Sequence, residues 1–377
     1  MEYAFLSHES AIQANWAIAR NPRIPQLDDE GIWMIPSPDS CVTTQGSLKK
    51  LMAEVSFDNL GIIRRPIDLL VPDASSRSRG KIVSFHVWRD MFPDRAFRRI
   101  HERIFVSSPL FTILQLTLVP RPSRLAKAAA EETAREDARI REELGIAGDS
   151  LEGDDLLAWE AISRQARAIQ VLTDFAGTYR LPIRDSDQVL YEMPPLMHCD
   201  DLRSFLDNQP SMRGSGKGYA VADLAFDNSG SPMETALALM LTLPVEMGGY
   251  GLPKPILNWS VPIDPEMRGI AAQDEIIADL CWRDYGLVIE YDSWEKHGKL
   301  GPAKLAKDHA RANSLTALGW KVLTVGSVQI ASAQGVALIA RQVATLLGIT
   351  LAEPTDIQRI WRSRLHAMLM PRIVRFS

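Results

Sequence analysis

Short apolar runs alternate with helical repeats along most of this 377-residue chain. Near the N-terminus, Ser7 is placed to cap a helix that contains Ala11 and Ala14. Residues 109–118 predict a second, apolar helix. Three further runs, bounded by polar or turn residues, predict strands at residues 66–71, 81–87 and 103–107. Together these elements predict a mixed α/β domain over residues 1–120.

The composition changes at residue 122, where Ala, Arg and Glu begin to dominate. Opposite charges three or four residues apart predict an exposed helix over residues 122–144, and a second helix follows over residues 154–179. We favour a solvated connector here, and a helix pair that joins two copies in a homodimer is the alternative. Residues 181–230 show no clear period, so residues 121–230 are interpreted as a helical connector with an irregular region.

The pattern is clearest from residue 231 onward. Ser231 and Pro232 predict the start of a helix, and Gly319 and Gly348 predict the ends of two later helices. The predicted order is helix, three strands, helix, strand, helix, at residues 231–243, 256–263, 275–282, 287–291, 302–318, 320–325 and 333–347. The chain is therefore predicted to be α/β (α+β), with a mixed sheet flanked by helices over residues 231–348. Residues 349–377 predict a basic C-terminal helix and tail, which we expect to be solvated.

Composition and charge narrow the classes of function. Hydrophobic residues make up 46% of the chain and charged residues 24%, and the net charge of −5 argues against a protein that coats nucleic acid over its whole surface. The three cysteines form no CxxC pair, which argues against a zinc ribbon or a disulfide framework. The N-terminus has no signal-peptide pattern, and the apolar stretch at residues 235–243 is too short to span a bilayer. We expect a cytoplasmic protein without a membrane partner.

Carboxylates stand where buried strands should have none. Residues 287–289 are apolar and lead directly into Glu290, and Asp292 leaves the same face of that strand. Asp279 lies near the end of the preceding strand, and Glu234 lies in the first turn of the preceding helix. An unpaired carboxylate in an apolar setting costs several kcal/mol, whereas Mg²⁺ or Mn²⁺ would keep such a group ionised. We predict that Asp279 and Glu290 bind the metal and that Glu234 completes the site.

Basic residues follow the carboxylates. His297 is placed near the expected metal-bound water, which it and Asp292 would position or deprotonate. Lys304, Lys307 and Arg311 recur on one helix face and would hold phosphate groups. A solvated charged face is the alternative for these cations. With 47 Asp and Glu in the chain, ordinary salt bridges remain the alternative for the acids.

This arrangement resembles the PD-(D/E)XK nuclease superfamily, and more narrowly its very-short-patch-repair-like endonuclease branch. The resemblance implies a restriction-endonuclease-like fold and Mg²⁺-dependent hydrolysis of phosphodiester bonds. Ser293 replaces the glycine usual in that branch, and a second histidine after His297 is absent. The resemblance is carried by Glu234, Asp279, Glu290-Tyr291-Asp292, His297, Asp308 to Arg311, Leu318 and Gly319.

The N-terminal region weakly resembles abortive-infection type IV antitoxin proteins, through residues 6–11, 66–72 and 106–109. The combined resemblance predicts a DNA endonuclease or nickase of defence or repair type, whose N-terminal domain selects the target or a protein partner. One alternative is a catalytically inactive, nucleic-acid-binding regulator or antitoxin-like protein with a degenerate nuclease fold. A structural partner protein is the third reading.

Overall fold

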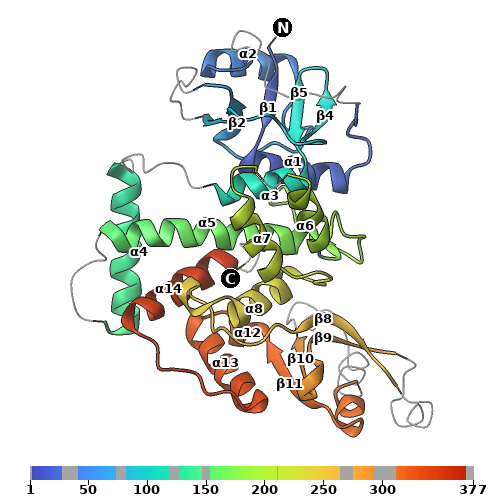
Figure 1. Ribbon diagram of the computed structural model, residues 1–377, viewed down its shortest axis with the longest axis vertical. Coiled ribbons are helices and arrows are strands. Elements are labelled where there is room, and N and C mark those ends of the chain that lie inside the picture. Colours follow the sequence, from blue (N-terminus) through green and yellow to red (C-terminus); the bar gives the residue numbers. More distant parts are fainter. Residues whose placement is uncertain are drawn as a thin grey trace. The chain divides into compact units, whose positions relative to one another are not determined.

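The computed structural model describes residues 2–27, 41–73, 82–118, 127–146, 153–209, 211–263, 275–292 and 311–370. The protein mixes helices with mixed sheets, as predicted for its class. It divides into two compact units, Met1–Val119 with Thr178–Asp223, and Pro120–Gly177 with Leu224–Ser377 (Figure 1). The predicted connector at residues 121–230 is therefore shared between the units.

A five-stranded mixed sheet organises the first unit, in the order β3-β2-β1-β5-β4. β1 runs parallel to β5 and antiparallel to β2, and the predicted strands at residues 66–71, 81–87 and 103–107 are confirmed. The apolar faces of the sheet and of α1 form a core that includes Leu6, Leu69 and Val106. The strands are β1 (Ala4–Leu6), β2 (Ile67–Val71), β3 (Val83–Val87), β4 (Phe97–His101) and β5 (Ile104–Ser107), and the helices among them are α1 (His8–Arg20), α2 (Gln45–Glu54) and α3 (Pro109–Thr117).

The three segments that carry the antitoxin resemblance are neighbours in this sheet. Leu6 is opposite Leu69 on one side and Val106 on the other. The Ser107 hydroxyl donates a hydrogen bond to the Leu6 carbonyl, 2.9 Å away. Segments about 60 and 100 residues apart in the sequence are thus joined at one place by β1.

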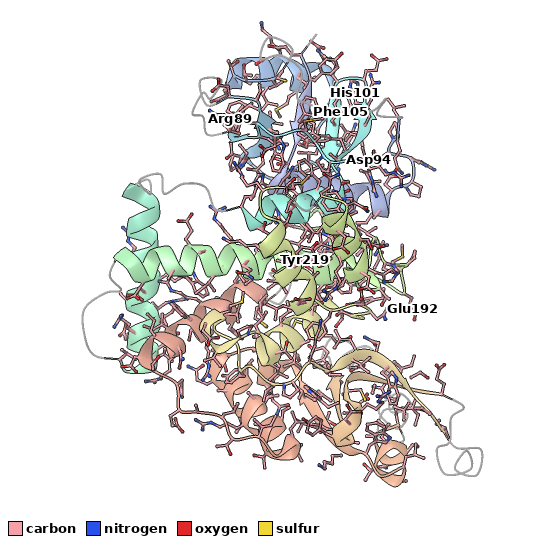
Figure 2. The ribbon with its side chains drawn as sticks, in the orientation of Figure 1. Arg89, Asp94, His101, Phe105, Glu192 and Tyr219 are labelled. Atoms are coloured by element: carbon pink, nitrogen blue, oxygen red, sulfur yellow. The ribbon has the colours of Figure 1, made fainter. Side chains whose placement is uncertain are left out.

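Aromatic side chains fill the other part of this core. The ring of Phe105 on β5 stacks on Phe5, with ring centroids 5.0 Å apart (Figure 2). Phe97 and Phe111 meet edge to face at 5.6 Å, which brings α3 against the sheet. Offset and edge-to-face pairs are the favoured aromatic geometries, so these contacts stabilise the sheet beyond the area that they bury.

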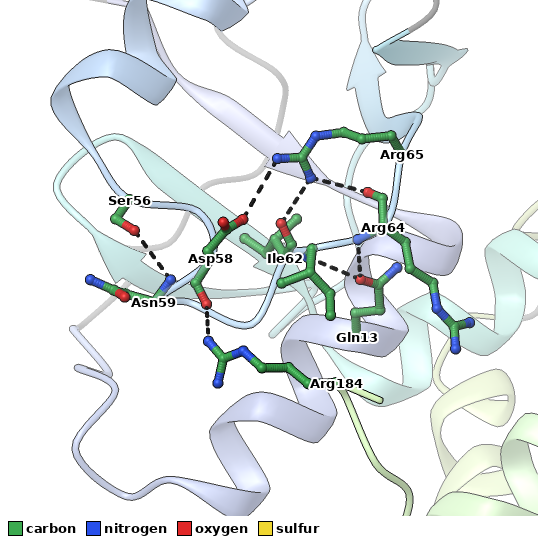
Figure 3. Close-up of polar contacts among 9 residues, drawn as sticks. Gln13, Ser56, Asp58, Asn59, Ile62, Arg64, Arg65 and Arg184 are labelled. Atoms are coloured by element: carbon green, nitrogen blue, oxygen red, sulfur yellow. Dashed lines mark hydrogen bonds and ion pairs between the residues drawn. The ribbon is translucent and has the colours of Figure 1, made fainter. Parts of the chain in front are cut away.

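Residues 178–223 belong to the first unit because long-range hydrogen bonds attach them to it. The Arg184 guanidinium donates to the Asp58 carbonyl at 2.9 Å, and Arg65 is paired with the Asp58 carboxylate at 3.8 Å (Figure 3). Arg20 donates to the carbonyls of Arg180 and Leu181. This segment contains β6 (Tyr179–Arg180), β7 (Leu190–Tyr191), α6 (Cys199–Asp207) and α7 (Ser215–Leu224).

Helices α4 (Lys127–Leu144), α5 (Gly153–Phe175) and α14 (Asp356–Leu369) belong to the second unit. The C-terminal half of α5 is buried, with Ile169, Leu172 and Phe175 fully inaccessible, so the prediction of a solvated connector is wrong for this helix. α14 packs against α4, α5 and α8, and its Arg364 is 3% exposed. The predicted solvated end is therefore wrong over α14, because its apolar face covers the other helices.

A four-stranded mixed sheet completes the second unit, in the order β11-β10-β9-β8. β8, β9 and β10 form an antiparallel meander, and β11 runs parallel to β10. The predicted strands and helices of residues 231–348 are confirmed where the structure describes them, including the left-handed Gly319 and Gly348 that follow two helices. The elements are α8 (Pro232–Thr242), β8 (Ile256–Val261), β9 (Ile276–Trp282), β10 (Leu287–Asp292), a helix at residues 311–317, β11 (Lys321–Gly326), α12 (Ser327–Ile330) and α13 (Ala333–Leu347).

Two general properties bear on the predicted surroundings. In the described residues, no helix combines the length and the apolar character needed to cross a bilayer. Cys41, Cys199 and Cys281 are all buried, and none of the three forms a disulfide in the described part of the chain.

Candidate functional site

The N-terminus of α8 fixes the position of Glu234. The Ser231 hydroxyl accepts a hydrogen bond from the Glu234 backbone N–H at 3.2 Å, and Pro232 occupies the first turn, as predicted. The Glu234 side chain is directed back toward the loop before the helix. Its Oε2 accepts hydrogen bonds from the Gly230 N–H at 2.9 Å and from Asn258 Nδ2 at 2.7 Å. Glu234 is only 7% exposed, so these bonds hold a nearly buried carboxyl in one orientation.

The strand register brings Asp279 and Glu290 to the same row of the sheet. The backbone pairing of β9 with β10 extends as far as Ile289 and Leu280. Continuing the same register by one residue sets Glu290 against Asp279. Side chains directly opposite each other on an antiparallel pair leave the same face, with Cβ atoms about 4.5–5.5 Å apart. Asp279 Oδ2 also accepts a hydrogen bond from the Tyr291 N–H at 2.6 Å, which joins the two strands at this row.

The same row continues onto both outer strands. Asn258 on β8 lies between the recorded pairs Leu257–Leu280 and Trp259–Ala278, and so falls beside Asp279. On the other side, Glu290 pairs with Thr324 of β11. Asn258, Asp279, Glu290 and Thr324 thus form a polar row across the four strands.

Glu290 is buried and only partly satisfied. It is 5% exposed, and its Oε2 forms an ion pair with the Arg311 guanidinium. Its Oε1 is buried without a hydrogen-bond partner in the described part of the chain. Leu315, four residues after Arg311, belongs to the same apolar cluster as Val288 and Cys281, so the helix at residues 311–317 covers the face from which Glu290 projects.

The electrostatics show that the carboxylates influence one another. Burial, together with the nearby negative charge of Asp279, raises the pKa of Glu234 from its ordinary value of 4.5 to about 7. The hydrogen bonds from Asn258, Gly230 and Ser231 oppose that rise only in part. Glu234 therefore exchanges a proton near neutral pH, as a general acid or base does.

The remaining predicted site residues have different outcomes. Asp292 ends β10 and is half-buried, two residues beyond Glu290 and thus on the same face. Arg311, predicted to hold phosphate, is instead engaged by Glu290. His297, Lys304 and Lys307 lie outside the described residues.

Asn258 is the site residue that the sequence reasoning missed. Its backbone is left-handed, with φ of 47°, a conformation that Asn adopts more readily than most residues. An Asn inside the otherwise apolar run at residues 256–261 was the available signal. Its amide donates both to Glu234 and to the Asn228 carbonyl, so it links β8 to the start of α8.

The site has carboxylates of the kind used in acid–base and metal chemistry, but its described residues do not form a complete set of metal ligands. In the described residues, no three His, Cys, Asp or Glu side chains gather closely enough to hold a metal ion. Comparison with protein-family models, with curated proteins and with solved structures returned no match for this chain.

Proposed function

We propose that the second unit is a metal-dependent DNA endonuclease or nickase, of the PD-(D/E)XK type and with a defence or repair role. One observation carries this proposal. Continued by one residue, the β9–β10 register sets Asp279 against Glu290, and Asp279 is close enough to Glu234 to raise its pKa. The three acidic residues lie on three separate elements, α8, β9 and β10.

The topology around these residues supports the same proposal. α8 precedes the antiparallel meander β8-β9-β10, and the helix at residues 311–317 leads into the parallel strand β11. This order is the one that the sequence pattern predicts for a restriction-endonuclease-like core. Glu234 lies on α8, Asp279 on β9, and Glu290 and Asp292 on β10, which supports the proposal.

The donor set fits a small divalent cation. In the described part of the chain, Glu290 Oε1 is a buried oxygen without a hydrogen-bond partner, and Asp279 Oδ2 accepts a hydrogen bond from the Tyr291 N–H. Mg²⁺ and Mn²⁺ prefer such oxygens, and Mg²⁺ needs only one or two protein carboxylates because it keeps several waters. Asp279 and Glu290 would hold the ion, which would make a bound water more acidic and offset charge on the phosphate.

The protein's own residues supply the remaining roles. Glu234, with its pKa near 7, accepts a proton from the attacking water. Asn258 fixes one oxygen of Glu234, which directs the other oxygen for that transfer. Asp292 lies on the face of Glu290 and helps to position the water.

The test is nicking of supercoiled plasmid by the full chain, with Mg²⁺ or Mn²⁺ and with EDTA. We expect cleavage that requires the metal and that is lost in Glu290→Gln and Asp279→Asn. Glu234→Gln is expected to slow cleavage by about 10²-fold or more. Glu275→Gln is the matched control, because Glu275 is an exposed acid immediately before β9 whose carboxylate accepts a hydrogen bond from the Ser260 hydroxyl. Equal cleavage by wild type and Glu290→Gln would exclude this site.

A second function, a catalytically inactive DNA-binding regulator, is favoured by one observation. Arg311 already neutralises Glu290, the position at which a metal would otherwise do so. On this alternative the ion pair is permanent and the chain binds DNA without cutting it. A gel-shift assay that shows binding, with no nicking in either metal, would select this alternative.

A further inference from the structure

A cavity lies in the second unit, and its lining includes none of the residues of the row formed by Asn258, Asp279, Glu290 and Thr324. It has a volume of about 880 Å³ and is lined by α13, by α14, by the segment at residues 349–354 between them and by Tyr250. Ligand-binding cavities for organic molecules usually measure about 300–1,000 Å³, so this one is far larger than a bare inorganic ion requires.

The charged lining of the cavity is mainly cationic. Arg341 comes from α13, Arg359 and Arg362 come from α14, and Glu353 is the acidic lining residue. Arg359 is already engaged, by Asp356 at 3.2 Å and by the Leu144 carbonyl at 2.7 Å. In the described part of the chain, neither Arg341 nor Arg362 has a carboxylate within ion-pair distance.

The environment of Arg362 also favours the binding of an anion. Its guanidinium lies 4.2 Å from the centre of the Tyr250 ring, and among the described residues its buried Nε has no hydrogen-bond partner. Burial and the like charge of Arg341 lower the pKa of Arg362, and Tyr250 and Glu353 oppose this only in part, so two cations and one acid, Glu353, act on one another at this cavity. Such an arrangement is unfavourable unless an anion supplies the missing charge and acceptor atoms.

The remaining lining combines apolar side chains with the uncharged polar residues Gln334, Thr345, Thr350 and Ser363. Small side chains of α13, at Ala333, Ala337 and Ala344, leave room beside the arginines, and Leu338 and Leu351 add larger apolar surface. A planar guanidinium that already lies on an aromatic ring favours phosphate recognition, because arginine binds two phosphate oxygens at once. The apolar walls and the volume suit an attached organic group.

We propose that this cavity binds a phosphorylated organic ligand of nucleotide size, with Arg341 and Arg362 contacting the phosphate. The ligand is either a free nucleotide or a phosphorylated nucleotide at the end of a nucleic-acid strand. The chemistry of recognition is the same in both cases. The inference is independent of the nuclease proposal, because it uses none of the carboxylates of the sheet.

The test is isothermal titration calorimetry on the full chain in EDTA, which prevents any metal-dependent cleavage. The probes are deoxyadenosine 5′-monophosphate, deoxyadenosine, inorganic phosphate and a short 5′-phosphorylated single-stranded oligodeoxynucleotide. We expect the monophosphate to bind and deoxyadenosine to bind at least about tenfold more weakly. Tighter binding of the oligonucleotide than of the monophosphate would assign the cavity to a strand end, and the reverse order to a free nucleotide.

Two variants test the assigned contacts. Arg341→Gln is the informative one, because Arg341 is exposed and its loss leaves the packing intact, and Arg362→Gln is the second. Each is expected to weaken the monophosphate at least about tenfold, whereas the exposed Arg283→Gln, outside the cavity, is expected to leave binding unchanged. The proposal is overturned if wild type binds no phosphorylated probe at millimolar concentration, or if Arg341→Gln binds the monophosphate as wild type does.

Discussion

Replacing Arg311 by Gln removes the cation that neutralises Glu290. The Glu290 side chain is 7% exposed and the Arg311 side chain 30%, so the pair is largely buried. Removing one partner of a fully buried pair costs about 3–5 kcal/mol, because the other charge is left without compensation. Since Arg311 is partly in contact with water, we expect Arg311→Gln to lower the free energy of unfolding by about 2–4 kcal/mol in metal-free buffer.

A metal ion should reverse part of this loss if Glu290 is a metal ligand. At a Mn²⁺ concentration ten times the dissociation constant, binding to the folded state stabilises it by about 1.4 kcal/mol. The ion no longer competes with Arg311, so we expect Mn²⁺ to bind the variant at least as tightly as wild type. Urea denaturation followed by circular dichroism, with EDTA and with Mn²⁺, measures both effects.

Arg283→Gln is the control, because its ion pair with Asp284 is exposed and should contribute less than about 1 kcal/mol. If Arg311→Gln unfolds at the same urea concentration as wild type, the ion pair does not neutralise Glu290. If the variant is destabilised but Mn²⁺ restores none of the loss, Glu290 is not a metal ligand and the regulator alternative is supported.

Three further predictions follow from other buried groups. Asp137→Asn should lower the free energy of unfolding by about 3–5 kcal/mol in urea denaturation, because the side chains of Asp137 and its partner Arg364 are both 2% exposed. The control Glu143→Gln, an exposed position on the same helix, should lower it by less than about 1 kcal/mol. Equal losses in the two variants would refute the packing of α4 on α14. The pKa of Glu234 is about 7 in the folded state and 4.5 in the unfolded state, so Glu234 binds its proton more tightly when the protein is folded. The free energy of unfolding of wild type in EDTA should therefore fall by up to about 3 kcal/mol as pH rises from 4.5 to 7. The Glu234→Gln variant should not show this loss. Burial raises the pKa of Cys281 to about 11 and the pKa of Cys41 to about 12. Thiol reagents at pH 8 should therefore modify these cysteines slowly in the native chain and fully in the unfolded chain. Rapid modification of either cysteine in the native chain would contradict its burial.

The elements around the site were predictable because their signals are local. Ser231 and Pro232 mark the start of α8, and Gly348 marks the end of α13. The apolar runs that became β9 and β10 each have a strand's length, and the turn at Gly286 needs a left-handed residue. Such features depend on a few neighbouring residues, so a single sequence carries them.

The features that were not predictable depend on partners distant in the sequence. The association of residues 178–223 with the N-terminal region rests on bonds such as Arg184 to Asp58, across 126 residues. The strands of this segment have two residues each, too few to show a period. The solvated connector was predicted from the charge pattern of residues 122–144, and burial of Ile169 and Phe175 in the following helix required knowledge of α8 and α14.

The candidate site shows the same division. Its acids were predictable because Glu290 interrupts a buried strand, which is a local anomaly. The role of Arg311 was not, because its spacing from Lys304 and Lys307 describes a helix face but not what that face contacts. Asn258 escaped notice because its importance comes from Glu234, 24 residues earlier in the chain.

The central claim is that Asp279 and Glu290 together bind a divalent cation. Calorimetric titration of Mn²⁺ into wild type, Asp279→Asn and the exposed control Asp284→Asn tests it most directly. Our account predicts one site per chain in wild type and in the control, and none in Asp279→Asn, which keeps an oxygen to accept the Tyr291 hydrogen bond. A wild-type protein that takes up no Mn²⁺, or an Asp279→Asn variant that binds it as tightly as wild type, would contradict the account.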